Sequence, residues 1–222
     1  MAEHDPAGMR LNYDLGTLED TALAHTPLAQ FERWLADAVA CDPIVEPNAM
    51  VLGTVGNPPS SRSVLMKGID ARGLTFFTNY GSRKAGAIEA DPRVTALFPW
   101  YPLHRQVAIV GRAHRVSREE SAAYFVTRPH LSQLGAMASD QSAAIASRDV
   151  LDERMAQLMA QYPEGSAVPL PDNWGGYLIT VESMEFWQGR RSRLHDRLRF
   201  ESLGTGSRLD TATDWRVQRY AP

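Results

Sequence analysis

The chain has 222 residues, of which 44% are hydrophobic, enough for a sizeable core in one large domain or two small ones. Its net charge of −3 argues against general affinity for nucleic acids, and no apolar run or signal-peptide core indicates a membrane span or export. A single cysteine, Cys41, excludes an intramolecular disulfide and a cysteine-based metal cluster. These features favour a soluble cytoplasmic protein.

The first half of the chain predicts one helix followed by short strands. Residues 1–26 are polar and mixed in charge, so we expect a mobile N-terminal arm in which Arg10 and Tyr13 are the residues of interest. Thr26-Pro27 combines a helix cap with proline at the first helical position, and an apolar stripe follows. Strands joined by tight turns are predicted at residues 50–55, 62–69, 74–79, 94–100 and 106–110.

The second half predicts two more helices and several strands. Ser117-Arg118-Glu119-Glu120 is a capping box whose helix ends before Pro129. Ser147 is expected to cap a helix that runs to about Gln161. Strands are predicted at residues 177–181, 185–188 and 215–220. Because βαβ rhythm and a GxGxxG motif are both missing, we expect an antiparallel meander or barrel with flanking helices, as a single domain over residues 27–222.

The stretch from Phe186 to Phe200 alternates in its second half, which is typical of a strand. Its apolar residues share one parity and its basic residues the other: Leu194, Leu198 and Phe200 against Arg193, His195, Arg197 and Arg199. We therefore expect the apolar set to enter the core. Adjacent cations repel one another unless an anion lies between them, so the other face is either a solvated arginine-rich surface or an anion site.

Only two of the 23 basic residues are lysines, and both lie in motifs that favour anion binding. Lys67 lies five residues after Arg62, so the two face opposite ways in a regular strand; one ligand could use both only at a bulge, a strand end or a subunit boundary. Lys84 and Arg83 occupy the first turn of a helix that Ser82 caps, where the helix dipole disfavours cations. A bound phosphate would resolve that conflict, and a solvent-screened helix end is the alternative.

A second oxyanion site is predicted near Pro129. Tyr124 and Arg128 are four residues apart and share a helix face, and Ser132 follows the proline. The alternative is a tyrosine stacked on an arginine at the surface. Gln106 begins an apolar strand, and its amide could bind the edge of a heterocycle because it both donates and accepts hydrogen bonds. Two oxyanion sites with flat-ring binders suggest two phosphorylated, aromatic ligands.

Six sequence blocks, in order, resemble the pyridoxine/pyridoxamine 5′-phosphate oxidase family. They are RSVLMK (62–67), FFTNYGSRKA (76–85), FPWYPLHRQV (98–107), RPHLSQLGAMASDQS (128–142), WGGY (174–177) and EFWQGRRSRLHDR (185–197). The resemblance implies a mainly antiparallel β fold of the α+β class, a split β-barrel of about six to eight strands with flanking helices. It also implies a homodimer with FMN bound at the subunit interface, a position that would let Arg62 and Lys67 serve one ligand.

The resemblance carries the family's site residues onto this chain. The flavin-binding pattern falls on Arg62, Ser63, Val64, Leu65, Met66, Lys67, Phe77, Thr78, Arg83, Lys84, Gln106, Gln141, Ser142, Trp187 and Arg197. The substrate-binding pattern falls on Lys67, Tyr124, Arg128, Ser132, Arg193, Leu194 and His195. Arg193 and His195 match the catalytic positions; we expect Arg193 to orient the substrate and assist the departure of the C4′ proton, and His195 to position the substrate.

The implied activity is oxidation of pyridoxine 5′-phosphate and pyridoxamine 5′-phosphate to pyridoxal 5′-phosphate, with O2 as acceptor and H2O2 as product. A phenazine-pathway flavin oxidase of the same fold is an alternative, and the presence of the whole substrate-phosphate set argues against it. A non-catalytic split-barrel protein that binds flavin or pyridoxal phosphate is another, and Arg193 and His195 argue against that. The sequence departs from the family at acidic Leu18-Glu19-Asp20, which puts a lid role of the arm in doubt, and at basic Arg190-Arg191.

Overall fold

The computed structural model describes residue 8 and residues 12–222, so the predicted interest in Arg10 lies outside the described residues. Its strands are β1 (Ala49–Thr54), β2 (Ser60–Asp70), β3 (Gly73–Asn79), β4 (Arg93–Trp100), β5 (Arg105–Arg115), β6 (Trp174–Gln188), β7 (Asp196–Ser202) and β8 (Trp215–Arg219). Its α-helices are α1 (Pro27–Val39), α2 (Arg83–Ala90), α3 (Arg118–Phe125), α4 (His130–Ala138) and α5 (Asp149–Gln161).

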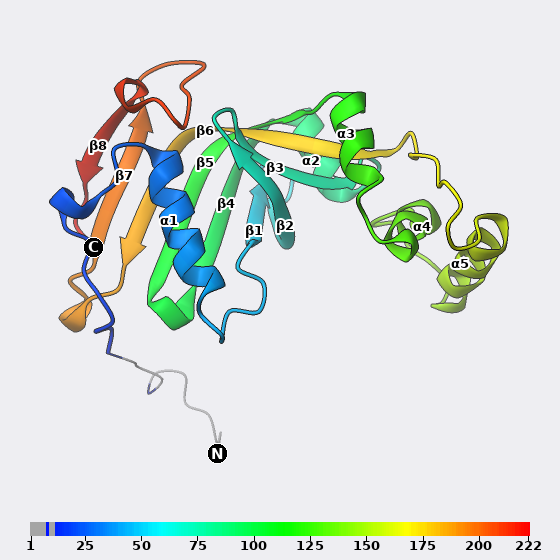
Figure 1. The fold of residues 1–222 in the computed structure, drawn as a ribbon, viewed down its shortest axis with the longest axis horizontal. Helices are drawn as coiled ribbons and strands as arrows, with labels where there is room; N and C mark the ends of the chain where they lie inside the picture. Colours follow the sequence, from blue (N-terminus) through cyan, green and yellow to red (C-terminus); the bar gives the residue numbers. More distant parts are fainter. Residues whose placement is uncertain (1–7, 9–11) are drawn as a thin grey trace.

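The eight strands of the described chain form one antiparallel sheet that closes into a barrel. The strand order is β3-β2-β1-β4-β5-β6-β7-β8, and an additional pairing between β3 and β6 closes the first six strands. The first half of β6 pairs with β3 and its second half with β7, while β5 runs along its other edge. Strand β6 therefore leaves the barrel at its second half, where β7 and β8 extend the sheet (Figure 1). The predicted antiparallel barrel with flanking helices is confirmed.

Helix α1 covers the main core, which fills the barrel (Figure 1). Thr26 caps the helix as predicted, since its Oγ1 accepts a hydrogen bond from the backbone N–H of Ala29 at 3.2 Å. Phe31 and Trp34 are buried and face the barrel. A second, smaller core lies beyond the barrel, where α3, α4 and α5 pack near the start of β6; its buried residues are Phe125, Leu134, Val168 and Trp174.

Replacing Phe31 with alanine is expected to lower the free energy of unfolding by about 3–5 kcal/mol, because the ring is fully buried and leaves a cavity. The Phe31 ring lies 5.1 Å from that of Phe98 and 5.9 Å from that of Trp100. Urea unfolding measures the change. Val39→Ala on the same helix is the matched control, since Val39 is 66% exposed and its truncation should change stability by about 0.5 kcal/mol or less. Equal losses in both variants would contradict the role of α1 in closing the core.

Two sequence predictions about local structure are wrong, and one helix was missed. Ser147 does not cap α5: the helix begins at Asp149 without a side-chain cap, and the Ser147 hydroxyl donates to the Asp149 carboxylate instead. Helix α4 was not predicted, although the apolar spacing of Leu131, Leu134 and Ala138 is helical. The two strands predicted at 177–181 and 185–188 are one long strand, β6.

The alternating strand predicted to include Leu194 begins only at Asp196. Leu198 and Phe200 are buried as expected, but Leu194 is 71% exposed and the predicted core position is wrong. The cause is the backbone of Ser192 and Arg193, whose φ angles of 56° and 61° are left-handed and turn the chain out of the sheet. Arg193 and His195 therefore lie in a loop before β7 rather than along a strand face.

Candidate active site

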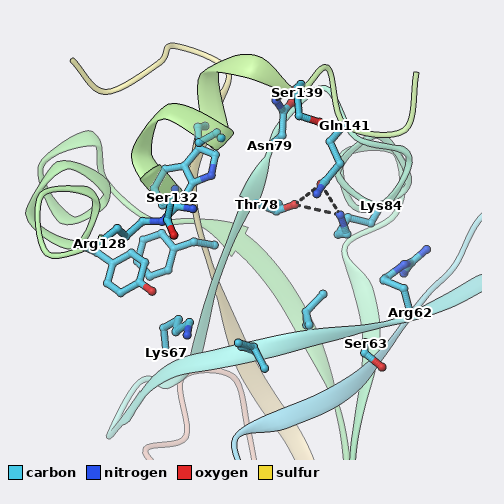
Figure 2. Close-up of a pocket in the computed structure, with 17 residues that line it drawn as sticks. Arg62, Ser63, Lys67, Thr78, Asn79, Lys84, Arg128, Ser132, Ser139 and Gln141 are labelled. Atoms are coloured by element: carbon cyan, nitrogen blue, oxygen red, sulfur yellow. Dashed lines mark hydrogen bonds between the residues drawn. The ribbon is translucent and has the colours of Figure 1, made fainter. Parts of the chain in front are cut away.

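A cavity of about 650 Å³ lies between β2, β3, the start of α2 and helices α3 and α4 (Figure 2). It brings together most of one group of predicted residues. These are Arg62, Ser63, Val64, Leu65, Lys67, Phe77, Thr78, Lys84, Tyr124, Arg128, Ser132 and Gln141. Asn79, Ser139 and Trp174 line the cavity as well and were not predicted as site residues. All three lie inside blocks that carry the family resemblance, which is the signal that could have found them.

Arg62 and Lys67 both reach this cavity despite their odd spacing, as Figure 2 shows. The register of β2 against β3 shifts between Met66 and Gly68, which marks a β-bulge. A bulge breaks the strict alternation of faces, so it removes the conflict that the spacing posed. Met66 itself is only 5% exposed and belongs to the barrel core, so it does not line the cavity.

Lys84 is a buried cation without an anionic partner in the described chain. It is 8% exposed, and its Nζ donates to three neutral oxygens: Gln141 Oε1 at 2.6 Å, Thr78 Oγ1 at 3.0 Å and Ser82 Oγ at 3.4 Å. Burial, with a further contribution from the charge of Arg62, lowers the pKa of Lys84 to about 8. A negatively charged group held next to Nζ would offset this unfavourable burial.

The cavity is strongly cationic. Arg62, Lys67, Lys84 and Arg128 line it, and none of the lining residues in the described chain is an aspartate or a glutamate. The charge of Arg62 lowers the pKa of Lys84, and burial and the charge of Arg83 outside the cavity lower that of Arg62, so these cations disfavour one another. Clustered cations without counter-charges are unfavourable in the empty protein and are suited to an anionic ligand.

The residues predicted to form a second oxyanion site lie together on one side of this cavity, where the chain passes from α3 to α4. The rings of Phe77 and Tyr124 stack with centroids 3.9 Å apart, and the guanidinium carbon of Arg128 lies 4.7 Å from the centre of the Trp174 ring. The Nη1 atom of Arg128 is buried and has no hydrogen-bond partner among the described residues. Burial lowers the pKa of Arg128 and raises that of Tyr124. An oxyanion would satisfy this unpaired donor.

The glycines of the WGGY block keep the cavity wall thin at the start of β6. A Cβ on Gly175 would clash with the hydroxyl of Tyr80, and one on Gly176 would lie 2.8 Å from Cε1 of Phe77. A side chain at Gly176 would displace the Phe77 ring, which stacks against both Tyr124 and Trp174, and one at Gly175 would displace Tyr80. The block therefore has a steric reason to be glycine.

Arg83 and Ser142, two residues of the predicted flavin-binding set, do not line the cavity. Arg83 is exposed, and its backbone N–H donates to the Ser142 Oγ at 3.2 Å. This bond joins the helix start to the loop that also carries Gln141. Ser82 caps the helix as predicted. Of the two cations expected at this helix end, Lys84 is thus the one that lines the cavity.

A second group of predicted residues lies at the opposite end of β6. Gln106 and Arg197 are the sheet neighbours of Trp187 on its two sides. The ring centroids of Trp187 and His195 are 4.5 Å apart, and the Tyr13 ring lies 5.6 Å from His195. Trp174 lines the cavity and Trp187 lies 13 residues further along β6, a distance of about 43 Å at about 3.3 Å per residue. One chain therefore does not bring the two groups together.

Arg197 is held by a buried carboxylate that the sequence analysis missed. Its guanidinium donates to both oxygens of Glu185, at 3.1 and 3.0 Å, and Arg199 donates to the same carboxylate. Glu185 is 7% exposed, so its charge is well shielded from water. An acid at the start of the arginine-rich block EFWQGRRSRLHDR (185–197) was the available signal.

His195 has a defined tautomer in this structure. The backbone N–H of Arg190 donates to His195 Nδ1 at 3.0 Å, so Nδ1 is unprotonated and the neutral ring carries its proton on Nε2. Burial and the charge of Arg193 lower the pKa of His195, and Asp196 acts in the opposite direction. Arg193 and Leu194 are exposed beside the ring.

The antiparallel split barrel with its cationic cavity places this chain in the general class of split-barrel proteins. One family model, "Pyridoxamine 5'-phosphate oxidase", matches residues 38–162, and another, "Pyridoxine 5'-phosphate oxidase C-terminal dimerisation region", matches residues 174–222. The chain therefore belongs to the pyridoxine/pyridoxamine 5′-phosphate oxidase family, as the six sequence blocks predicted.

Relatives agree with this assignment over the full length. A pyridoxine/pyridoxamine 5′-phosphate oxidase of Streptomyces avermitilis is 52% identical, over 99% of this chain and 97% of that protein. One of Kineococcus radiotolerans is 48% identical, over 98% of this chain and 99% of that protein. The crystal structure of PhzG from Burkholderia lata, in complex with tetrahydrophenazine-1-carboxylic acid, has a TM-score of 0.82 at 30% identity and covers 93% of this chain and 98% of that one. The predicted oxidase class and split-barrel fold are confirmed.

Proposed function

We propose that this chain binds FMN and oxidises pyridoxine 5′-phosphate and pyridoxamine 5′-phosphate to pyridoxal 5′-phosphate. The observation that carries the proposal is the cavity with four cations and no carboxylate among its described lining residues. It offers two separate positions for an oxyanion, one at Lys84 and one at Arg128, which fits a phosphorylated cofactor beside a phosphorylated substrate. The proposal includes the cytoplasmic location that the composition favoured. Among the described residues, no helix is long and apolar enough to cross a membrane.

The residues around Lys84 fit the phosphate of FMN. Lys84 supplies a buried ammonium, Arg62 a second cation, and the start of α2 contributes backbone N–H groups and its dipole. Thr78 and Gln141 hold the Lys84 ammonium in place through hydrogen bonds (Figure 2). When bound, FMN supplies the redox chemistry by accepting a hydride from the C4′ carbon of the substrate and passing the electrons to O2.

The residues around Arg128 fit the phosphate of the substrate. Lys67 provides a point charge, Arg128 a planar fork with one unpaired donor, and Tyr124 and Ser132 provide hydroxyls. Holding the phosphate here fixes the substrate ring relative to the cofactor, which lowers the entropic barrier to reaction. We assign Arg193 to orienting the substrate for departure of the C4′ hydrogen as a hydride, and His195 to positioning the substrate ring.

We further propose that the site is completed across a homodimer. The cavity and the Trp187–His195 group lie at opposite ends of β6, so one site needs the cavity of one protomer and the aromatic group of its partner. The match of residues 174–222 to a dimerisation region supports this arrangement, since that region contains Trp187, Arg193 and His195.

The decisive experiment is to mix the purified flavoprotein with pyridoxine 5′-phosphate in the absence of oxygen. We expect the flavin absorbance to bleach and to return when air is admitted, with formation of the aldehyde. A flavin spectrum that does not respond would contradict the oxidase, and failure to bind added FMN would contradict the site itself.

The likeness to PhzG supports a second candidate, oxidation of a tricyclic carboxylic acid, and the cavity argues against it. Both candidates place the FMN phosphate at Lys84, so they differ at Arg128. There the additional cation of Lys67 and the hydroxyls of Tyr124 and Ser132 fit a doubly charged phosphate better than a monocarboxylate. Turnover of a dihydrophenazine carboxylate with no response to pyridoxine 5′-phosphate would reverse this preference.

A further inference from the structure

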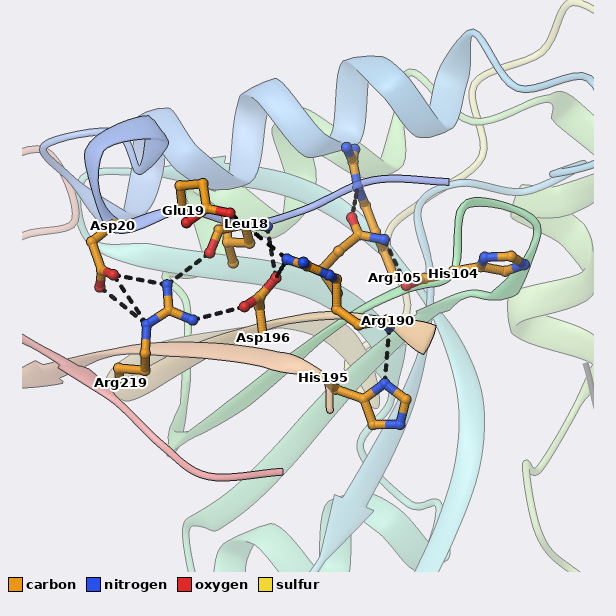
Figure 3. Close-up of polar contacts among 10 residues, drawn as sticks. Leu18, Glu19, Asp20, His104, Arg105, Arg190, His195, Asp196 and Arg219 are labelled. Atoms are coloured by element: carbon orange, nitrogen blue, oxygen red, sulfur yellow. Dashed lines mark hydrogen bonds and ion pairs between the residues drawn. The ribbon is translucent and has the colours of Figure 1, made fainter. Parts of the chain in front are cut away.

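One buried carboxylate, that of Asp196, joins three segments beside His195 (Figure 3). Its Oδ2 accepts from the backbone N–H of Leu18 at 3.0 Å and from Arg190 Nη1 at 2.8 Å. Its Oδ1 accepts from Arg219 Nη1 at 2.8 Å. The Asp196 side chain is only 13% exposed, and its two arginines and the Leu18 N–H hold its pKa below the usual value. The carboxylate thus links the N-terminal segment, the loop after β6 and the last strand.

The N-terminal segment is itself attached to the barrel at this point. Leu18 is 2% exposed and packs in the main core. Arg219 donates to the Leu18 carbonyl at 2.8 Å and to the Asp20 carboxylate at 2.9 Å. Glu19 lies 3.7 Å from Arg190. The acidic Leu18-Glu19-Asp20 stretch, which set this sequence apart from the family pattern, therefore serves as an attachment. The mobile arm predicted over residues 1–26 stays a prediction for the residues before Leu18.

The link from Asp196 to His195 runs through Arg190. The Arg190 side chain is fixed by Asp196, and the Arg190 backbone N–H is the donor to His195 Nδ1 (Figure 3). A fixed donor at Nδ1 selects the tautomer with the proton on Nε2 and sets the rotation of the ring. Asp196 therefore acts on the imidazole without touching it.

The loop between Arg190 and His195 needs such support. Ser192 and Arg193 both have left-handed φ angles, which non-glycine residues adopt only when their surroundings hold them. On the other side, the Tyr13 ring packs so closely on Gly189 that a Cβ there would lie 2.8 Å from Tyr13 Cγ. The loop is thus fixed at its start by Tyr13 and at Arg190 by Asp196.

We propose that Asp196 is a positioning residue, which acts through Arg190 to hold His195 in one tautomer and one orientation for the substrate. The inference rests on the proposed function, because it assigns the held imidazole to the substrate site. It adds a role for the N-terminal segment, because the Leu18 N–H donates a hydrogen bond to the same carboxylate.

The exposure of each side chain indicates how much its contact contributes to this network. Asp20 is 65% exposed in its pair with Arg219, and Arg191 is 76% exposed in its pair with Asp14, so each contributes little. Asp196 is mostly buried and has three donors. We therefore expect a large effect from Asp196 and Arg190, and a small one from Asp20.

The test compares holoenzyme variants Asp196→Asn and Arg190→Gln with wild type in steady-state kinetics and in 15N spectra of the histidine rings. Both variants should lose about 10- to 100-fold in kcat/KM for pyridoxine 5′-phosphate, as expected for a misplaced group, with FMN binding unchanged. The His195 signal, assigned with His195→Asn, should change from one tautomer to a mixture. Arg190→Gln keeps the other bonds of Asp196, so it tests the link even where Asp196→Asn folds poorly. Asp210→Asn, in the exposed pair with Arg208, is the matched control and should match wild type.

A double-mutant cycle separates positioning from a merely structural role. If Asp196 acts through His195, Asp196→Asn should add almost nothing to the loss in His195→Asn. Additive losses, or a single His195 tautomer in both network variants, would overturn the proposal. The ring spectra need no turnover, so they test the link even if wild type fails to oxidise pyridoxine 5′-phosphate, a result that would count against the proposed function alone.

Discussion

Replacing Lys84 with methionine is expected to weaken FMN binding about 10- to 100-fold while making the FMN-free protein more stable. The loss follows from removing a charge-assisted bond to a phosphate, worth about 1.5–3 kcal/mol. The gain follows because the ammonium is 8% exposed and has only neutral oxygens around it. Methionine has nearly the same length, and Thr78 and Gln141 keep their mutual hydrogen bond of 2.9 Å. Opposite signs for binding and stability would identify a residue kept for its ligand.

The pH dependence of this effect has a definite sign. The pKa of Lys84 is about 8 in the folded protein and 10.5 in a free lysine, so below pH 8 the folded state carries the full cost of charging it, about 3 kcal/mol. Between pH 8 and 10.5 the unfolded chain binds more protons, so stability rises with pH. The advantage of Lys84→Met over wild type should therefore be constant below pH 8 and disappear by about pH 10.5.

Denaturant unfolding of the FMN-free proteins and fluorescence titration with FMN provide the two measurements. Lys67→Met is the matched control, because it is the same substitution at the other lysine of the cavity. Lys67 is exposed, so its ammonium is solvated and its removal should give no gain in stability. If Lys84→Met were destabilised, or bound FMN as tightly as wild type, Lys84 would not hold the cofactor phosphate.

The sequence was most informative where local chemistry decides the structure. Thr26, Ser82 and Ser117 all cap the helices assigned to them, since each needs only a hydroxyl next to a free N–H. It was least informative after Gln188, where Leu194 continues the strand pattern but lies in a loop. The alternation there is genuine from Asp196 onward. What interrupts it is the left-handed backbone of Ser192 and Arg193, beside a network around Asp196 that connects residues up to 201 positions apart and leaves no local signal.

The types of residue in the candidate site were predictable from the sequence. Their division into two groups at opposite ends of β6 was not. Tyr124, Arg128 and Ser132 line one cavity as expected, but α3 ends at Phe125, so Arg128 lies in the turn before α4 and the predicted shared helix face is wrong. Arg62 and Lys67 meet through a bulge that spacing alone could only leave open. Trp187 and His195 lie at the far end of β6 because β6 is a single long strand. The sequence predicted its two halves as separate strands, so this separation was not predicted. Glu185 was missed because a buried acid among arginines has no periodicity of its own.

Arg128→Ala is expected to raise the KM for pyridoxine 5′-phosphate about 100-fold and to leave the FMN content unchanged. Arg128 Nη1 is buried without a partner, so a substrate oxyanion is the group that would satisfy it, and charged hydrogen bonds of this kind contribute about 1.5–3 kcal/mol each. Arg128→Lys keeps the charge but loses the planar fork, and should lie between the two. Steady-state kinetics with bound flavin measured by absorbance provide the comparison.

Pyridoxine without its phosphate is the matched control, since it cannot use Arg128. Its weak turnover should be nearly equal in wild type and Arg128→Ala. The preference for the phosphorylated substrate should therefore fall by the same factor as the KM for pyridoxine 5′-phosphate rises. Equal losses with both substrates would mean that removing the guanidinium disturbs the aromatic stack of Phe77, Tyr124 and Trp174 instead. Loss of flavin from Arg128→Ala would mean that the two oxyanion positions are exchanged, with Arg128 holding the cofactor phosphate and Lys84 that of the substrate.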